Sequence, residues 1–559
     1  MSDIKLPGGE TSHVDTFARD NLPPREMWAE ISFSSLPELT ACPGRLNAAD
    51  YVLDHHVREG RGGRRAFVFG GAEWTYAELQ NRADRIARVL TEDQGLAPGN
   101  RVLLRGPNNP MMAATWLGVI KAGGVCVPTM PMLRARELAF VIDKARIRHA
   151  LCDIALAEEL DLTRERASGL ETVSYFTGLG EGTDPRADLD GRIADKPAGF
   201  ANVDTAADDV AFIAFTSGTT GQPKGTIHFH RDILAACECF PRHVFDARPE
   251  DVYTGSPPLA FTFGLGAFLC FPLRYGSSVV LVDKPSPQTL LEAIETHRCN
   301  TLYTAPTMYR AMLDLLADYD ISSLEKCVSA GETLPKPTFD AFHDKTGIRI
   351  IDGIGSTEML HIFIASSGDD IRPGATGKVV PGYEARILDD EGRPLPPGHV
   401  GHLAVRGPTV CRYLDDPERQ HAYVKDGWNL PGDLYLEDED GYYWYQGRSD
   451  DLIISAGYNI SGPEVEAVLL ESPKVKECAV VASPDPERGH IVKAFVVLSD
   501  PGEAGDTTAS ELQDLVKKEI APYKYPRAVE FIDVLPRTQT GKVQRSKLRQ
   551  LEEERARNR

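Results

Sequence analysis

A loop rich in glycine and hydroxyl side chains follows an apolar run and delivers a lysine. Residues 215–225 read FTSGTTGQPKG, directly after the apolar run that begins at Val210. Glycines let backbone N–H groups approach an anion, the hydroxyls add donors, and Lys224 adds positive charge. The pattern predicts a polyphosphate cradle, although its spacing is not that of a Walker A loop and no GxGxxG opens a helix after a strand. A flexible surface loop is the alternative that composition alone leaves open.

Further polar clusters follow the phosphate loop along the chain. They are Ala330-Gly331-Glu332, DGIGSTE at 352–358, Gly432-Asp433, GRSDD at 447–451 and PRTQTGK at 536–542. Taken singly, Asp433 and Arg448 would be turn and surface residues, and Lys542 would be a solvated charge. His228 and His230 form an HxH pair, but nothing nearby completes a zinc site of the usual spacing. We therefore expect these histidines to support the phosphate loop.

Up to about residue 440, the sequence has the pattern of a layered α/β structure. Its strands and helices must position the polar residues. Short β-branched runs alternate there with helical patterns. The strand-like runs are RVLLRG from Arg101, VCVPTM from Val125, VAFIAF from Val210 and SVVLV from Ser278. A helix is predicted from Tyr76, with one apolar stripe formed by Leu79, Ala83, Ile86 and Val89.

The sequence changes between Tyr435 and Asp451, where the turn-like EDEDG precedes the aromatic YYWYQ and the charged GRSDD. We place a domain boundary at Ser449 to Asp450, which gives an N-terminal domain over 1–449 and a C-terminal domain over 450–559. Beyond it we expect a small α+β domain, in which a capping box of Ser461 and Glu464 begins the first helix. Its predicted elements are a helix from about 463, strands near 478–482 and 494–498, a helix near 511–520 and a strand near 528–532. Low-complexity sequence is confined to the tail EEERARNR.

Composition excludes several classes of protein. The chain has 559 residues, with 42% hydrophobic and 26% charged, so it can bury large cores and is not a disordered polypeptide. Its formal net charge of -21 has the wrong sign for a surface that grips nucleic acid or anionic lipid. The ten scattered cysteines contain no CxxC pair, and the first residues have no apolar run behind a basic start. We therefore expect a cytoplasmic protein with no membrane span and no nucleic-acid partner.

The ordered motifs carry a resemblance. TSGTTGQPKG and the five later motifs, in this order over nearly the whole chain, resemble the signatures of the adenylate-forming superfamily, which contains acyl-CoA and aryl-CoA synthetases. Within it, DTFARDNLPP from Asp15, GTIHFHRD from Gly225 and GIGSTEMLHIF from Gly353 look most like benzoate-type ligases, and among these like 2-aminobenzoate-CoA ligases. The resemblance implies a large layered N-terminal α/β domain with a small mobile C-terminal domain.

By resemblance, the enzyme would convert a carboxylate into an acyl-adenylate, release pyrophosphate and then pass the acyl group to a thiol. The first step brings two anions together, so it needs positive charge and a metal ion. Lys542 would supply the cation at the substrate carboxylate and the α-phosphate. Glu358 would bind Mg²⁺, Thr357 would meet the α-phosphate, and Lys224 would complete the catalytic set.

The resemblance also assigns the ATP site. Asp433 would accept both ribose hydroxyls, with Arg448 donating to the same sugar. The nucleotide-binding residues implied are Thr216, Ser217, Gly218, Thr219, Thr220, Gly331, Glu332, Asp352, Gly353, Ile354, Asp433 and Arg448.

A pocket for an aromatic acid is implied in the same way. Its residues would be Thr262, Phe263, Phe271, Ala330, Gly355, His361 and Ile362. Small residues would leave a slot for a flat ring, against which Phe263 could stack edge-on. Core packing is the alternative for Phe263 and Phe271. His361 is either a satisfied core histidine or the group that meets an ortho substituent.

Two further residues concern movement between the half-reactions. Asp450 resembles the hinge about which the small domain rotates, because one site cannot present both Lys542 and the thiol path to the same carbonyl. Gly457 would pass close to the pantetheine chain of coenzyme A in the second state. A larger side chain at Gly457 should block thioester formation and spare adenylation.

The expected function is ATP- and Mg²⁺-dependent ligation of an aromatic acid to coenzyme A, with 2-aminobenzoate first and benzoate second. A carrier protein acting in trans is an alternative acceptor, since the basic residues Arg527, Lys547 and Arg549 are too generic to identify coenzyme A. A non-enzymatic acid sensor is the third hypothesis. Such a protein would have lost part of the catalytic site, yet the charged residues that the resemblance assigns to that site are all present: Lys224, Glu358, Asp433, Arg448 and Lys542. Monomer and homodimer both stay open.

Overall fold

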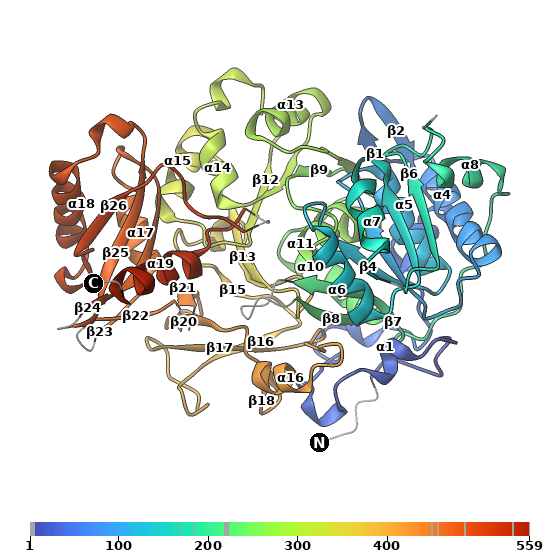
Figure 1. Cartoon of the computed structure of the whole chain (residues 1–559), viewed down its shortest axis with the longest axis horizontal. Coiled ribbons are helices and arrows are strands. Elements are labelled where there is room, and N and C mark those ends of the chain that lie inside the picture. The colour runs from blue at the N-terminus through green and yellow to red at the C-terminus, as the bar shows by residue number, and fades with distance from the viewer. Residues whose placement is uncertain are drawn as a thin grey trace.

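The computed structural model describes residues 6–167, 169–182, 184–216, 223–448, 451–455, 458–485, 488–538 and 541–557. Two large sheets with helices packed against them form the N-terminal part (Figure 1). This mixed architecture agrees with the predicted α/β class. None of the described helices is long and apolar enough to cross a membrane.

The first sheet has six strands in the order β6-β5-β3-β4-β7-β8 and is parallel except for the β7–β8 pair. Its strands are β3 (Arg101–Arg105), β4 (Val125–Thr129), β5 (His149–Asp153), β6 (Thr172–Phe176), β7 (Val210–Thr216) and β8 (Lys224–Phe229). All residues of β3, β4 and β5 are buried, as expected for central strands covered on both faces. The phosphate-loop sequence connects β7 to β8.

The second sheet has nine strands in the order β15-β14-β13-β12-β11-β9-β10-β1-β2, with a parallel centre and antiparallel edges. Its strands are β1 (Arg65–Phe69), β2 (Ala72–Thr75), β9 (Val252–Gly255), β10 (Ser278–Val280), β11 (Thr301–Thr304), β12 (Lys326–Ala330), β13 (Ile351–Gly355), β14 (Ile362–Ala365) and β15 (Lys378–Val379). Ligands of open α/β sheets bind beyond the carboxyl ends of parallel strands. Ala330 and Gly355 stand at such ends, on β12 and β13.

The helices around these sheets follow the predicted periodicity. The helix from Tyr76 is α4 (Tyr76–Arg88), it begins with a capping box of Thr75 and Glu78, and its predicted stripe is buried. The other helices are α1 (Phe17–Asp20), α2 (Pro37–Thr40), α3 (His55–Arg58), α5 (Pro110–Lys121), α6 (Ala135–Ala145), α7 (Ala157–Arg164), α8 (Asp188–Asp195), α9 (His230–Glu238), α10 (Phe240–His243), α11 (Thr262–Leu265), α12 (Phe271–Tyr275), α13 (Pro287–His297), α14 (Pro306–Met312), α15 (Lys336–Thr346) and α16 (Pro417–Tyr423). A π-helical segment, Gly266–Cys270, joins α11 to α12.

A third, antiparallel sheet lies below the other two in Figure 1, in yellow to orange. Its strands are β16 (Glu384–Leu388), β17 (Val400–Arg406), β18 (Val424–Lys425), β19 (Trp428–Asn429), β20 (Asp433–Glu437) and β21 (Tyr443–Arg448). The turn-like EDEDG therefore connects β20 to β21, and the aromatic run after it is β21. Pairing of Asp433 with Arg448 across this hairpin brings together two distant predicted site residues.

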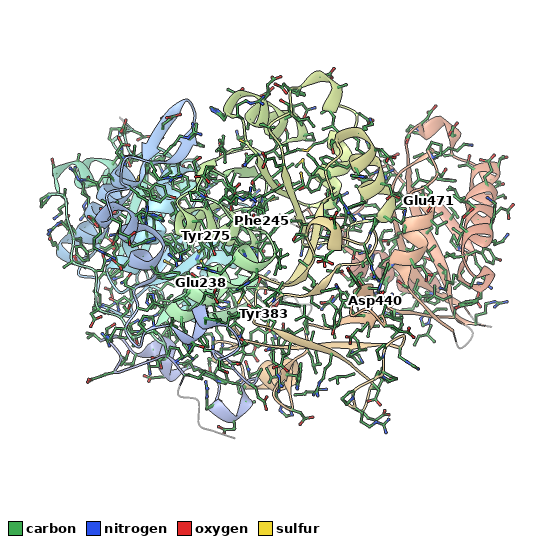
Figure 2. All side chains as sticks on the ribbon, turned by 180° about the vertical axis from the view of Figure 1, so that it is seen from behind. Glu238, Phe245, Tyr275, Tyr383, Asp440 and Glu471 are labelled. Carbon is green, nitrogen blue, oxygen red and sulfur yellow. The ribbon has the colours of Figure 1, made fainter. Side chains whose placement is uncertain are left out.

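The C-terminal elements bury cores of their own, separate from those of the N-terminal part. They are β22 (Ile453–Ser455), β23 (Tyr458–Ile460), α17 (Gly462–Leu469), β24 (Val475–Asp485), β25 (Gly489–Leu498), α18 (Asp506–Glu519), β26 (Ala528–Phe531) and α19 (Arg545–Arg557). They lie beside α14 and α15, and the view from behind shows Glu471 among them, apart from Phe245 and Tyr275 (Figures 1 and 2). The boundary predicted at 449–450 lies outside the described residues.

Two details of this C-terminal part differ from expectation. Ser461 accepts a hydrogen bond from the Glu464 N–H at 3.3 Å, but the Glu464 carboxylate binds Lys524 Nζ at 2.6 Å instead of returning to the helix start. A half-buried lysine partner thus replaces half of the predicted capping box. The charged tail forms the C-terminal part of α19, where Glu552 is buried and accepts from Ser483 Oγ and Lys493 Nζ.

Candidate active site

Lys224 and Glu358 form the centre of the predicted phosphate site. Lys224 begins β8, Glu358 lies in the turn after β13, and the Lys224 Nζ donates to Glu358 Oε1 at 2.5 Å. Tyr413 joins this pair, since its hydroxyl accepts from Lys224 at 2.8 Å and donates to Glu358 Oε1 at 2.7 Å. Burial alone would raise the pKa of Glu358, but Lys224 and Tyr413 outweigh it and lower that pKa. The carboxylate is therefore charged at neutral pH.

The donor set at Glu358 fits Mg²⁺ in one respect, because a charged carboxylate is a hard oxygen ligand. No group of three or more His, Cys, Asp or Glu side chains that could hold a metal occurs among the described residues. Mg²⁺ commonly binds through one or two carboxylates together with substrate phosphates and water. A metal held by Glu358 would therefore be shared with the nucleotide.

Gly331, Glu332 and Lys542 meet where the C-terminal elements approach β12. A Cβ on Gly331 would lie 3.5 Å from Lys542 Cε, and the Glu332 Oε1 accepts from the Val543 N–H at 3.3 Å. Lys542 is solvent accessible, yet desolvation is the largest influence on it and lowers its pKa. The nearby carboxylates, led by Glu332 and Asp433, act in the opposite direction. The lysine amine thus lies among the predicted nucleotide residues.

Asp433 and Arg448 form the pair predicted at the ribose. Arg448 Nη1 donates to Asp433 Oδ1 at 3.1 Å and to the Pro431 carbonyl at 2.9 Å. A Cβ on Gly432, whose φ is +85°, would lie 2.9 Å from Arg448 Nη2. The positive φ therefore favours glycine there, and a larger residue would also displace the Arg448 guanidinium.

Asp352 lies on β13 beside Gly353 and Ile354, in the predicted adenine wall. Its Oδ1 is buried with no hydrogen-bond partner among the described residues. Desolvation raises the pKa of Asp352 to about 8, although the Gly353 and Leu334 backbone groups oppose the shift. The carboxyl is therefore largely protonated at pH 7.

The predicted aryl-acid residues come from five elements, namely α11, α12, β12, β13 and β14 with the turn before it. Thr262 and Phe263 begin α11, Phe271 begins α12, and His361 and Ile362 lie where the turn after β13 enters β14. His361 contacts Phe271 at 4.5 Å and Phe263 at 5.7 Å between ring centroids. Two glycines of β13 make room for this corner, because a Cβ on Gly355 would lie 2.6 Å from the His361 carbonyl oxygen and one on Gly353 2.8 Å from Ile362 Cδ1. Ala330 ends the neighbouring strand β12.

His361 is a buried histidine whose ring nitrogens lack partners. It is 3% exposed, and neither nitrogen has a hydrogen-bond partner among the described residues. Burial lowers the pKa of His361 to about 3, and the nearby Phe263 backbone opposes this shift without reversing it. The imidazole is neutral, so one nitrogen can donate and the other can accept.

Some predicted residues cannot be placed. Ser217, Gly218, Thr219, Thr220, Asp450 and Gly457 lie outside the described residues. Thr216 ends β7, and its Oγ1 is buried with no partner in the described part of the chain. Thr357 lies next to Glu358 in the turn after β13, and its carbonyl accepts from His228 Nε2 at 2.8 Å.

Sequence reasoning missed Tyr413 at this site. It lies in a segment after β17, fully buried, and bridges Lys224 and Glu358. Nothing in the local sequence VCRYLDD distinguishes it from an ordinary core tyrosine. His230 begins α9 instead of sharing a strand with His228, so the HxH pair does not present both rings to one face.

Comparison with known proteins decides the family. The model of the AMP-binding enzyme family matches residues 53–414, and that of the AMP-binding enzyme C-terminal domain matches residues 464–542. The chain belongs to the AMP-binding enzyme family. This confirms the predicted resemblance and the expectation of an enzyme.

Relatives in the AMP-binding enzyme family cover nearly the whole chain. A benzoate–CoA ligase of Thauera aromatica is 36% identical over 522 residues, which is 92% of this chain and 98% of that protein. A 3-hydroxybenzoate–CoA ligase of Aromatoleum sp. (strain CIB) is 32% identical and covers 91% of this chain and 97% of its own length. The solved structure of the anthranilate CoA ligase AuaEII in complex with anthranoyl-AMP has a TM-score of 0.87 at 32% identity, covering 93% of this chain and 99% of that one. The predicted acyl-CoA synthetase-like fold is thereby confirmed.

Proposed function

We propose that this chain is an aryl-CoA ligase that activates 2-aminobenzoate with ATP as an acyl-adenylate and transfers the acyl group to coenzyme A. The observation that carries the proposal is His361, a neutral buried imidazole among aromatic rings with both nitrogens unpartnered in the described structure. Unsatisfied buried polar groups are costly and rare in folded proteins. An amino group ortho to the carboxylate would supply the missing hydrogen bond.

The names of the relatives support the substrate class. They act on benzoate, 3-hydroxybenzoate and anthranilate, all carboxylic acids on one aromatic ring. Benzoate is the second candidate, favoured by the 36% identity to the Thauera aromatica ligase. A site that hydrogen-bonds a substrate N–H discriminates strongly against an analogue that lacks it. The two acids should therefore differ sharply if His361 meets the amino group.

The resemblance to the family supports the following adenylation roles. Lys542 would neutralise the acid carboxylate and the α-phosphate, and Thr357 would donate its hydroxyl to that phosphate. Asp433 and Arg448 would hold the ribose, while Asp352 would face the adenine. Mg²⁺ held by Glu358 would offset phosphate charge when bound. Lys224 keeps the Glu358 carboxylate charged and oriented through its 2.5 Å hydrogen bond.

For the second step we propose two domains, 1–449 and 450–559, that reorient about Asp450 after the adenylate forms. Lys542 would then leave the reaction centre and Gly457 would line the path of coenzyme A. Arg310 on α14 donates to the Val475 carbonyl at 2.7 Å, a contact between the two proposed domains that reorientation would break.

The test is pyrophosphate release with ATP and Mg²⁺ across 2-aminobenzoate, benzoate, hydroxybenzoates and a medium-chain fatty acid, with and without coenzyme A. We expect the highest turnover with 2-aminobenzoate, dependent on coenzyme A. Release that coenzyme A does not accelerate would point to a carrier protein as acceptor, and no release with any aryl acid would refute the proposal.

A variant pair makes the substrate assignment sharper. His361→Phe keeps an aromatic ring and removes both nitrogens, so we expect kcat/KM for 2-aminobenzoate to fall by about 10 to 100-fold while benzoate is little affected. Phe271→Leu is the matched control, because it changes the same pocket without removing a polar atom and should affect both acids alike. Equal losses on both acids in His361→Phe would exclude recognition of the amino group by His361.

A further inference from the structure

Behind the Lys224–Glu358 pair lies a fully buried set of polar side chains that the proposed reaction does not use directly. His228, Asp232 and Arg412 are each 0% exposed. Arg412 Nη1 donates to Asp232 Oδ2 at 2.8 Å, and the same oxygen lies 3.7 Å from His228 Nδ1. Burial alone would raise the pKa of Asp232, but Arg412 and His228 outweigh it and hold that pKa below its usual range. A charged, buried carboxylate therefore faces the histidine.

The His228 ring is fixed in position by two contacts. It stacks on Phe212 with centroids 4.6 Å apart and planes at 22°. Its Nε2 lies 2.8 Å from the Thr357 carbonyl oxygen, which can only accept, so Nε2 is the donor of this hydrogen bond. The imidazole is thus held on two sides, by the Phe212 face and the Thr357 carbonyl.

Strand β8 contacts two consecutive residues of the turn after β13, Thr357 and Glu358. Side chains two and four positions apart on a strand share a face, so Lys224 and His228 of β8 project together. Lys224 binds the Glu358 carboxylate, and His228 binds the carbonyl of Thr357, the residue before it.

The turn that His228 holds is strained. Leu360 is buried with a φ of +72°, a left-handed conformation that is unfavourable for a leucine. Its N–H donates to the same Thr357 carbonyl at a longer 3.2 Å. Strained backbone persists where the surroundings over-determine it, and this occurs at functional sites. The hydrogen bond from His228 is one of the contacts that hold this turn in its strained conformation.

We propose that His228 is a positioning residue for Glu358, acting through the Thr357 carbonyl to hold the strained turn 357–360 so that the carboxylate faces Lys224 and the nucleotide phosphates. The proposal rests on the proposed function only for the identity of the reaction that Glu358 serves. The alternative is a core histidine that contributes to folding alone.

The experiment compares His228→Leu with His228→Gln, whose side-chain amide can replace the Nε2 donor. His149→Leu is the matched control, because His149 is also a buried strand histidine of this sheet with one hydrogen bond, to Thr172 at 2.8 Å. We expect His228→Leu to lower kcat for pyrophosphate release about tenfold, the effect of losing one buried hydrogen bond. His228→Gln should recover most of this loss, and His149→Leu should change kcat less than about twofold.

A double-mutant cycle separates positioning from folding. In a Glu358→Gln background, His228→Leu should cost less than about a further twofold in kcat, because the group it positions is already lost. The second readout is ATP affinity with and without Mg²⁺, measured by calorimetry in the absence of any acid. We expect the gain in affinity on adding Mg²⁺ to shrink several-fold in His228→Leu and to persist in His149→Leu.

Losses that multiply fully in the double variant, or an unchanged response to Mg²⁺ in His228→Leu, would overturn the proposal. A wild-type chain that releases no pyrophosphate with any aryl acid would refute the proposed function instead. The binding measurement would still report on His228 in that case, so the two failures are distinguishable.

Discussion

Replacing Gly266 with alanine is a sharp test of the aryl-acid corner. Gly266 has an ordinary helical backbone with φ of -62°, so alanine is not opposed by the main chain. Its Cβ, however, would lie 2.4 Å from His361 Cδ2, 2.6 Å from His361 Nε2 and 2.9 Å from Phe271 Cζ. Ordinary contact needs about 3.5 Å, so the imidazole must move by about 1 Å. His361 is buried and packed against Phe271, so this shift disturbs the contact between the two rings.

Two opposing free-energy contributions determine the stability of Gly266→Ala. Gly→Ala within a helical segment gains about 0.5–1 kcal/mol, whereas overpacking a core costs about 1–3 kcal/mol. We expect Gly266→Ala to lower the free energy of unfolding by about 1 kcal/mol or somewhat more. A 1 Å misplacement at a site can cost about a hundredfold in rate, so kcat/KM for 2-aminobenzoate should fall by about 10 to 100-fold.

The assay is pyrophosphate release with 2-aminobenzoate, paired with urea unfolding. Gly191→Ala in α8 is the control, because nothing lies within 4 Å of its added Cβ and the helix should gain stability without loss of activity. If Gly266→Ala retained both wild-type kcat/KM and wild-type stability, His361 would not be confined as the structure indicates. The reasoning about the aryl-acid pocket would then fail.

Three further predictions concern buried polar groups of the site. Tyr413→Phe removes the hydroxyl between Lys224 and Glu358, and kcat for pyrophosphate release should fall about tenfold while KM for the acid stays within about twofold; unchanged steady-state kinetics would show that the bridge does not matter. Asp352 has a folded pKa of about 8, far above its unfolded value, so it binds an extra proton in the folded state and its contribution to stability is complete below pH ~4 and lost as the pH rises through about 8. Urea unfolding from pH 4 to 9 should therefore show a decline that is weaker in Asp352→Asn, and identical profiles would contradict the protonated carboxyl. His361 has a pKa of about 3 and stays neutral above pH 5, so the ratio of kcat/KM for 2-aminobenzoate to that for benzoate should show no His361 titration between pH 6 and 9; a step near pH 6.5 that disappears in His361→Phe would show a charged ring.

Local pattern predicted the elements that carry the site. The runs from Arg101, Val125, Val210 and Ser278 are strands β3, β4, β7 and β10, because buried β-branched segments have few alternatives in a layered fold. The motif at residues 215–225 likewise singled out Lys224, which pairs with Glu358 in the structure. These features depend on residues close together in the sequence.

Contacts between distant segments could not be predicted in this way. Lys224 and Glu358 are 134 positions apart, and only the family resemblance placed them in one site. An isolated β-bridge to Thr226 of β8 brings Tyr413 to the site. No local sequence pattern predicts this contact. Glu464 was expected to complete a helix cap, but Lys524 on a later segment competes for its carboxylate. Long-range partners decided each of these cases.

The turn after β13 constrains how this enzyme could acquire new substrates. Glu358 and His361 stand three residues apart in one strained turn, tied further by the His361 N–H to the Met359 carbonyl at 3.0 Å. If the proposed roles hold, substitutions that alter acid choice by moving His361 also move the Glu358 carboxylate and compromise the proposed nucleotide step. Phe263 and Phe271 stand on separate short helices outside this turn. Evolutionary change in acid preference should accumulate at those two positions and spare the turn.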